Sequence, residues 1–359
     1  AARKGQERLS LDTPIRLDGK ATVTPAGPRL DTLSLSSSFA QASARGDLKD
    51  LDASLDVDLA AALAEAGKFV DLKSFSASGK IAARARIQAT NDAARVATAD
   101  VVLSGLKVTG VTPGPLTQES LKILASARLV TDTSGAVRAI HDAKVSLEGQ
   151  GMSGTAGFRM ATPGARPDDI GIEGGTIAFM ADIGTVLDLC RTAGLLPRNQ
   201  AGGGKITLSA AVTAGGGTFS LAPLHLHGTN LFYTVDGRTV REPAVDLVIR
   251  ATLDSAKGNL SVEAFTLASA PFSFDARGTV TDIRGLRQVI LDGTQECDFA
   301  RIGAWIGVFA GRPFEMEGKQ PDRFHLEVSL AGPTLLDRVR TLRAEAGIHL
   351  ASLKSFVMQ

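Results

Sequence analysis

The chain has 359 residues, of which 44% are hydrophobic, and its 39 basic and 38 acidic residues leave a formal net charge of +1. This apolar content excludes intrinsic disorder. Because the charge is balanced and only 5% of the residues are aromatic, we expect no nucleic-acid partner. The two cysteines, Cys190 and Cys297, are too few for a disulfide framework or a thiolate zinc site. No apolar run reaches the roughly 18 residues of a membrane-spanning helix.

The first third of the chain predicts a strand, a short helix and a second strand. Asp58 begins a helix-like segment at 58–66, where its carboxylate would accept hydrogen bonds from the first free amides. Gly79-Lys80 then opens a segment in which Ile81 and Ile87 alternate with charged and polar residues. Such alternation predicts an antiparallel strand with one apolar face and one solvated face.

The middle third has the same order of elements. Asp182 begins a predicted helix at 182–192, and Gly204-Lys205 opens the next strand. In that strand Ile206 and Leu208 alternate with polar residues, so we expect them on one apolar face.

The final third begins with a predicted hairpin at Asp236-Gly237, a dipeptide typical of two-residue β-turns. Asp298 begins a third predicted helix at 298–310, and Gly318-Lys319 opens the strand that follows. The alternating apolar residues that we expect on one face here are Val245, Leu247, Ile249, Phe272, Phe274, Leu326 and Val328.

The capped helix followed by Gly-Lys therefore occurs three times. The distance from the Asp to the Gly is 21, 22 and 20 residues, and the successive Asp residues are 124 and 116 residues apart. These near-equal spacings indicate an internal repeat. Because no long linker separates the copies, we expect one continuous sheet divided at roughly 1–110, 111–234 and 235–359.

Motifs that would indicate chemistry lack their required context. Gly149-x-Gly151-x-x-Gly154 matches the dinucleotide-binding pattern, but a strand rather than a helix is predicted after it, so we interpret it as a turn. His225 and His227 would share one face of a strand and supply half of a metal site, yet no third ligand is identifiable. We expect an exposed histidine pair, no metal, no cofactor and no catalytic residue.

The order of strands and helices resembles that of AsmA-like proteins of Gram-negative envelopes, the family of AsmA, TamB and YhdP. The resemblance is carried by 272–283 followed by 291–294 and Asp298-Phe299, and by 42–48 followed by 55–59. Residues 154–158 up to Asp182 match the pattern more loosely.

The resemblance implies a fold and a role. It implies a mainly β protein whose elongated, highly curved antiparallel sheet forms a U-shaped groove, as in bridge-like lipid-transfer proteins. It also implies a periplasmic location and an inner-membrane anchor, which we expect outside this chain because we take the chain as a fragment of a longer protein. The implied role is phospholipid transfer toward the outer membrane and maintenance of the envelope.

We therefore predict an apolar groove for the acyl chains of phospholipid or another lipid, with Asp58, Asp182 and Asp298 as structural helix caps. The alternative is a structural or adhesive β-repeat protein with closed cores and no ligand. An enzyme is the third hypothesis, with the pair His225 and His227 as its only support. The predicted groove-lining residues are Ile81, Ile87, Ile206, Leu208, Val245, Leu247, Ile249, Phe272, Phe274, Leu326 and Val328.

Overall fold

The structure is a computed structural model in which two compact units are distinguished. The first comprises Ala1–Pro163 and Thr185–Pro197, and the second comprises Gly164–Gly184 and Arg198–Gln359. Within these units the structure describes residues 2–4, 7–9, 11, 13–24, 27–47, 49–91, 93–132, 137–162, 171–197, 199–283, 288–329, 343–346 and 352–355.

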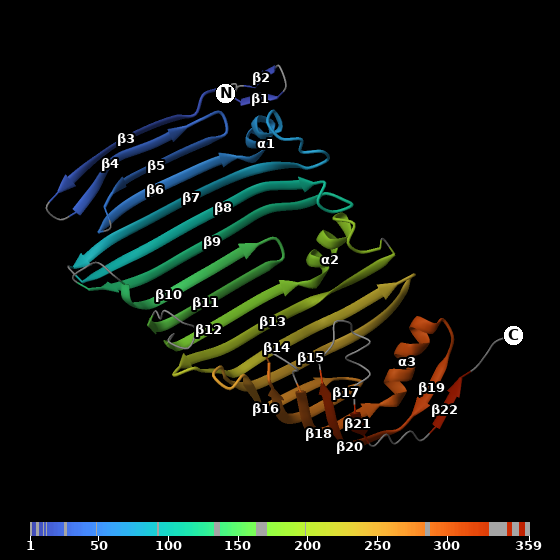
Figure 1. The fold of residues 1–359 in the computed structure, drawn as a ribbon. Helices are drawn as coiled ribbons and strands as arrows, with labels where there is room; N and C mark the ends of the chain where they lie inside the picture. The colour runs from blue at the N-terminus through green and yellow to red at the C-terminus, as the bar shows by residue number, and fades with distance from the viewer. Residues whose placement is uncertain are drawn as a thin grey trace. The chain divides into compact units, whose positions relative to one another are not determined.

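The first unit is built on one antiparallel sheet in which each strand pairs with the next strand along the chain (Figure 1). A separate hairpin pairs β1 (Ala2–Lys4) with β2 (Glu7–Leu9). Among the described residues, the outer strands β3 and β11 do not pair with each other, so this sheet is not closed. Its strands are β3 (Arg16–Thr24), β4 (Gly27–Ser36), β5 (Ala40–Gly46), β6 (Asp50–Asp58), β7 (Ser76–Asn91), β8 (Ala94–Thr109), β9 (Leu116–Thr131), β10 (Val137–Gly149) and β11 (Met152–Thr162).

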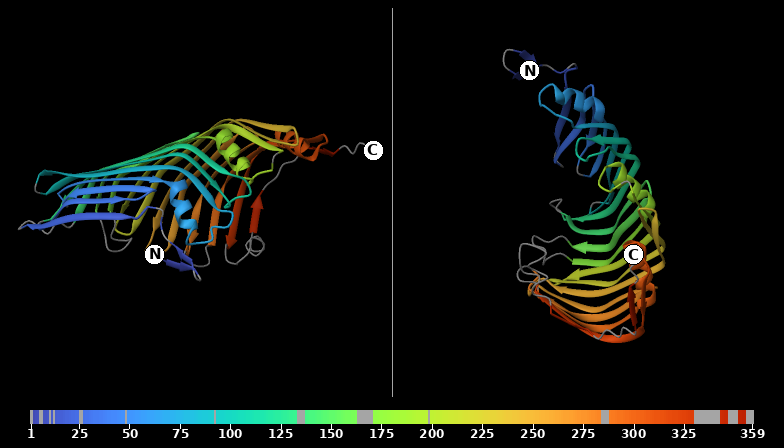
Figure 2. Two further views of the ribbon diagram at one scale, coloured as in Figure 1. Left: turned by 90° about the horizontal axis from the view of Figure 1, so that it is seen from above. Right: turned by 90° about the vertical axis from the view of Figure 1, so that its right-hand side faces the viewer.

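The second unit has a sheet of the same kind, which bends along the strand order from β13 to β20 (Figure 2). A small two-stranded sheet pairs β19 (Phe314–Glu317) with β22 (Ser352–Ser355). Within the described ranges, β12 and β21 have no pairing with each other, so this sheet is also not closed. The main strands are β12 (Gly171–Asp182), β13 (Gln200–Gly215), β14 (Thr218–Val235), β15 (Arg238–Asp254), β16 (Asn259–Ser269), β17 (Phe272–Thr281), β18 (Gln288–Asp298), β20 (Lys319–Ser329) and β21 (Arg343–Ala346).

Three short helices occur in the described chain where the sequence predicts them: α1 (Leu59–Gly67), α2 (Ile183–Thr192) and α3 (Phe299–Ala310). The prediction of a mainly β, antiparallel fold with a few short helices is confirmed. The division into three copies stays a prediction.

The repeated Asp and Gly-Lys elements have one geometry in all three places. Each Asp ends a strand directly before a helix. The Lys that follows the Gly is the register partner of this Asp on the neighbouring strand. The three pairs are Asp58 with Lys80, Asp182 with Lys205, and Asp298 with Lys319.

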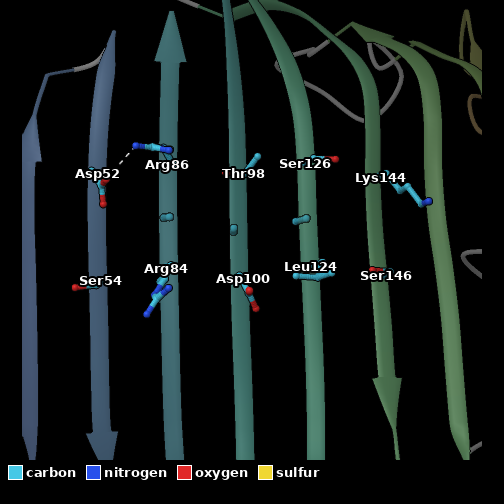
Figure 3. Close-up of a pocket in the computed structure, with 13 residues that line it drawn as sticks. Asp52, Ser54, Arg84, Arg86, Thr98, Asp100, Leu124, Ser126, Lys144 and Ser146 are labelled. Atoms are coloured by element: carbon cyan, nitrogen blue, oxygen red, sulfur yellow. Dashed lines mark ion pairs between the residues drawn. The ribbon is translucent and has the colours of Figure 1, made fainter.

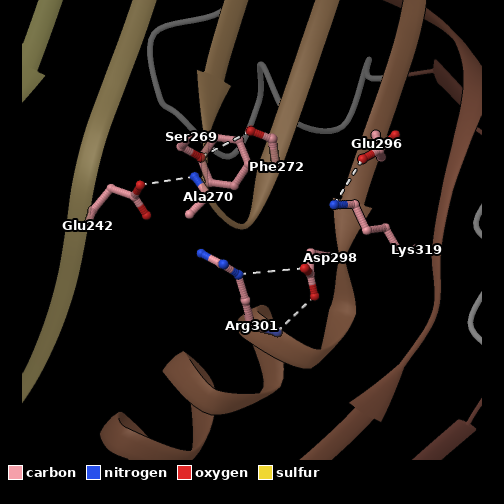
Figure 4. A network of polar contacts seen from close by, with 8 residues as sticks. All are labelled: Glu242, Ser269, Ala270, Phe272, Glu296, Asp298, Arg301 and Lys319. Atoms are coloured by element: carbon pink, nitrogen blue, oxygen red, sulfur yellow. Dashed lines mark hydrogen bonds and ion pairs between the residues drawn. The ribbon is translucent and has the colours of Figure 1, made fainter.

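Two of the three predicted helix caps show the expected hydrogen bond. The Ala61 amide donates to Asp58 Oδ1 at 3.0 Å, and the Arg301 amide donates to Asp298 Oδ1 at 3.2 Å (Figure 4). The backbone of each Asp is also fixed, because the Asp58 amide donates to Phe39 O and the Asp298 amide to Pro271 O, each at 2.8 Å. Each of these helices is thereby tied to the hairpin that precedes it.

The glycine of each Gly-Lys pair requires a conformation that other residues rarely adopt. The φ angles of Gly79, Gly204 and Gly318 are +125°, +115° and +136°. At Gly79 and Gly204 the strand register shifts, so the glycine forms a bulge where the strand after the helix joins its neighbour. The sequence repeat thus corresponds to a repeated backbone feature.

The sheets contain almost no packed core. In the described part of the chain the buried hydrophobic residues are all alanines, namely Ala161, Ala193, Ala210, Ala251 and Ala276. Pro271 is the largest side chain that is fully buried there. Leu, Ile, Val and Phe side chains consequently keep part of their surface exposed, as expected for sheets covered on neither face.

The turns that the sequence singles out are hairpins. Asp236 and Gly237 have φ angles of +49° and +76° and join β14 to β15, as predicted. Gly151, with φ +70°, lies in the tight turn between β10 and β11, so the glycine-rich motif is a turn and not the start of a helix.

The bulge glycine gives the first testable prediction. A Cβ on Gly204 would lie 2.7 Å from Thr229 O and 2.8 Å from Asn230 O, whereas a Cβ on Gly216, with φ +58°, would meet no atom within 4 Å. We expect Gly216→Ala to lower the free energy of unfolding by roughly 1–2 kcal/mol, the cost of a left-handed conformation, and Gly204→Ala to lower it by more. Urea unfolding followed by circular dichroism measures both, and equal losses would contradict the bulge assignment.

Candidate functional site

One face of the second sheet is lined with apolar side chains in continuous rows. Residues directly opposite each other on antiparallel strands share a face, so the strand register defines each row. The first row crosses six strands through Phe179, Leu208, Leu226, Leu247, Leu267 and Phe274. The second crosses through Ala210, Leu224, Ile249, Phe265, Ala276, Gly293 and Phe324. The third crosses through Leu221, Ala251, Val262, Gly278, Leu291 and Leu326, and the fourth through Phe219, Leu253, Leu260, Val280, Val289 and Val328. We call this surface the second apolar face.

Nine of the predicted lining residues lie on the second apolar face. Ile206 and Val245 lie beside its first row, since both are register partners of Gly228, and Phe272 adjoins Phe274. All nine side chains are partly exposed. The nine are Ile206, Leu208, Val245, Leu247, Ile249, Phe272, Phe274, Leu326 and Val328.

Aromatic side chains form a cluster at one side of this face. The ring centroids of Phe272 and Phe274 are 5.8 Å apart, and those of Phe274 and Phe324 are 6.1 Å apart, both in edge-to-face geometry. Such pairs add about 0.5–1.5 kcal/mol to the burial of the rings. The face also becomes more polar here, because Gln295 is the register partner of both Phe274 and Asp322.

Sequence reasoning missed several lining residues. Leu224 and Leu226 alternate with His225 and His227. This alternation predicts two leucines on the face opposite to the histidines, but the sequence analysis interprets only the histidine pair. Phe265 was not predictable by alternation, because a bulge in β16 separates it from Val262 although both face the same side.

The first sheet also has an apolar face, which holds the other two predicted residues. Ile81 is the register partner of Leu103, and Ile87 is the partner of Ala97. Between these rows run an alanine row and a row of larger residues, Leu55, Ala83, Val101, Ile123 and Leu147. Leu55 and Val145 on this face are 39% and 45% exposed. We call it the first apolar face.

A hollow lies on the opposite, polar face of the first sheet, where no site was expected (Figure 3). Its volume is about 710 Å³, and Arg86 Nη2 lies 3.6 Å from Asp52 Oδ2 at one side of it. Its lining mixes charges with hydroxyl groups, so it suits polar groups and not acyl chains. The lining residues are Asp52, Ser54, Arg84, Ala85, Arg86, Thr98, Ala99, Asp100, Leu124, Ala125, Ser126, Lys144 and Ser146.

The histidine pair lies on the polar face of the second sheet. His225 and His227 are both exposed, and His227 Nδ1 lies 2.5 Å from Asp246 Oδ1 on the adjacent strand. No group of three or more His, Cys, Asp or Glu residues within the described ranges is placed to hold a metal ion. Among these residues the structure therefore places no third metal ligand beside His225 and His227.

Comparison of the chain with protein-family models and with curated proteins finds no match. Among the described residues, no helix has both the length and the apolar character needed to cross a membrane.

Cys297 places a thiol on the second apolar face, where it is the register partner of Phe272 and Gln320. Burial raises the pKa of this thiol above its ordinary value, and the negative charge of Asp322 raises it further. Since the thiolate is the nucleophile, less of the reactive form is present at neutral pH.

This shift predicts slow alkylation. In a Cys190→Ser background, we expect Cys297 to react with iodoacetamide more slowly than free N-acetylcysteine between pH 7 and 9, and its rate to keep rising at higher pH. The added substitution Asp322→Asn should lower the thiol pKa and increase the rate at pH 8. A rate that matches the free thiol at every pH would contradict this prediction.

Proposed function

We propose that this chain is a segment of an AsmA-like periplasmic protein that binds phospholipid acyl chains on its apolar sheet faces. In this proposal it takes part in phospholipid transfer between the inner and outer membranes and in building and maintaining the outer membrane. The full-length protein would be anchored in the inner membrane. Binding is passive, and no residue acts as a catalyst.

The proposal rests on the arrangement and the exposure of the apolar side chains. They lie in rows on one face of each sheet, yet in the described residues none larger than alanine or proline is buried. Leaving such rows in water is unfavourable, so an apolar ligand is expected to cover them.

Acyl chains fit this surface in energy and in chemistry. Each methylene moved from water onto an apolar wall contributes about 0.8 kcal/mol, so ten methylenes contribute roughly 8 kcal/mol before the costs of association. The rows offer hardly any hydrogen-bonding group, and an acyl chain requires none. The polar head group of the lipid would stay in water or at the edge of the face.

The alternative with closed cores fits the structure less well. A closed sandwich buries large side chains between two sheets, about 10 Å apart. Here Ile177 and Phe179, on the second apolar face, are 42% and 38% exposed. An adhesive role through the same open face remains an outcome that the following experiment separates from lipid binding.

Adjacent residues on β15 provide a matched test. Ile249 lies on the second apolar face, whereas Val248 faces the opposite side with His225 and Thr266 as its register partners. We expect Ile249→Asp and Val248→Asp both to fold, and only Ile249→Asp to lose uptake of a fluorescent phospholipid. Circular dichroism checks folding, and native mass spectrometry counts bound lipid.

Two results would contradict the proposal. Unfolding by Ile249→Asp alone would indicate a closed core at this position. A wild-type chain that is purified without lipid and takes up no phospholipid would remove the acyl-chain function itself.

A further inference from the structure

Arg95 is a largely covered arginine on the first apolar face. It is the second residue of β8, and only 8% of its surface is exposed. Its register partners are Ala89 and Leu129, and alternation places its side chain on the same side as Ala97, the partner of Ile87. A guanidinium thus lies at the end of a strand whose next residues on that face are apolar.

Thr131 lies diagonally across from Arg95. The Thr131 amide donates to Ala93 O at 2.9 Å, and Thr131 follows Leu129 by two residues on β9, which puts both on the same face. Thr131 is 5% exposed, and its Oγ1 is buried without a hydrogen-bond partner. Diagonal neighbours on a sheet face are about 7–8 Å apart, within reach of an arginine side chain.

This pair leaves hydrogen-bonding capacity unused. Within the described contacts no hydrogen bond or ion pair involves the Arg95 guanidinium, whereas Arg128 pairs with Asp142 at 3.0 Å on the same sheet. None of the Arg95 nitrogens is among the described buried atoms that lack a partner, so the guanidinium reaches solvent from a side chain that is otherwise covered. The Thr131 hydroxyl, in contrast, is buried without a partner, which is unfavourable. An anionic group supplied from outside would satisfy both side chains.

We propose that Arg95 and Thr131 bind the phosphate head group of a lipid whose acyl chain lies along the first apolar face. The guanidinium donates to two phosphate oxygens at once, and the threonine hydroxyl donates to a third. From Arg95 the same face of β8 continues through Ala97, Ala99, Val101 and Leu103, a length of about 27 Å. This inference rests on the proposed function, because it assigns the head-group site for the same ligand.

Arg84 is a matched control for Arg95. It lies on the neighbouring strand β7, it is exposed, and it has no ion pair or hydrogen bond among the described contacts. Its register partner Asp100 belongs to the polar hollow, so its side chain faces away from the first apolar face. Arg84→Gln removes the same charge from the same sheet without touching the proposed site.

The test compares two ligands with the same chain, dodecyl phosphate and the neutral dodecyl maltoside, by isothermal titration of the full chain. We expect Arg95→Gln to weaken dodecyl phosphate binding roughly 10- to 100-fold, the range for a charge-assisted contact, and to leave the neutral ligand unaffected. Arg95→Lys should keep part of the preference, and Arg84→Gln should change neither ligand. Without ligand, Arg95→Gln should keep nearly the wild-type Tm, so a loss of binding is not a loss of folding.

Each contrary result has a defined meaning. Retained phosphate preference in Arg95→Gln, or equal losses in Arg84→Gln, would overturn the head-group site while neutral binding supports the proposed function. Failure of the wild-type chain to bind either amphiphile would overturn both proposals. Inorganic phosphate that binds as tightly as dodecyl phosphate would assign Arg95 to a free anion and overturn the lipid head group.

Discussion

Hydrogen bonding between neighbouring backbones is the interaction on which both sheets depend. In an ordinary domain a packed core contributes most of the stability. Here the buried apolar side chains of the described residues are alanines and one proline, so the ladders hold the strands, as in β14 and β15, which pair from Thr218 with Asp254 to Val235 with Arg238. A ladder satisfies the backbone but covers neither face. The apolar face of such a sheet is therefore exposed unless another part of the molecule or a ligand covers it.

The helices lie at the strand ends. α1 follows β6 and α3 follows β18, and in Figure 1 each lies beyond the end of the strand that leads into it. The caps at Asp58 and Asp298 bind each helix to the preceding hairpin through the backbone as well as through the carboxylate. The bulge glycines then let the next strand rejoin the sheet. This repeated device turns the chain without placing a helix across the apolar rows, which leaves them available to a ligand.

Much of this arrangement is encoded locally and was predictable. Period-two alternation placed Leu247 and Ile249 on one face, and the Asp and Gly-Lys spacing located all three helices. Alternation fails where the backbone departs from regular pairing, as at the bulge between Val262 and Phe265. It also fails where both sides of a strand are apolar. In β8, Val96 and Val102 lie opposite to Ala97 and Val101, so the sequence does not show which face receives Arg95.

Arg95 is largely covered and has no hydrogen bond or ion pair among the described contacts. Its stem covers part of the apolar face, while its guanidinium reaches solvent. The Thr131 hydroxyl beside it is buried without a partner, and natural proteins keep such costly groups where function requires them. A phosphate offsets that cost, while the adjoining apolar residues of β8 cover the chain attached to it. The charge and the apolar face therefore favour one amphiphilic ligand over a purely apolar one.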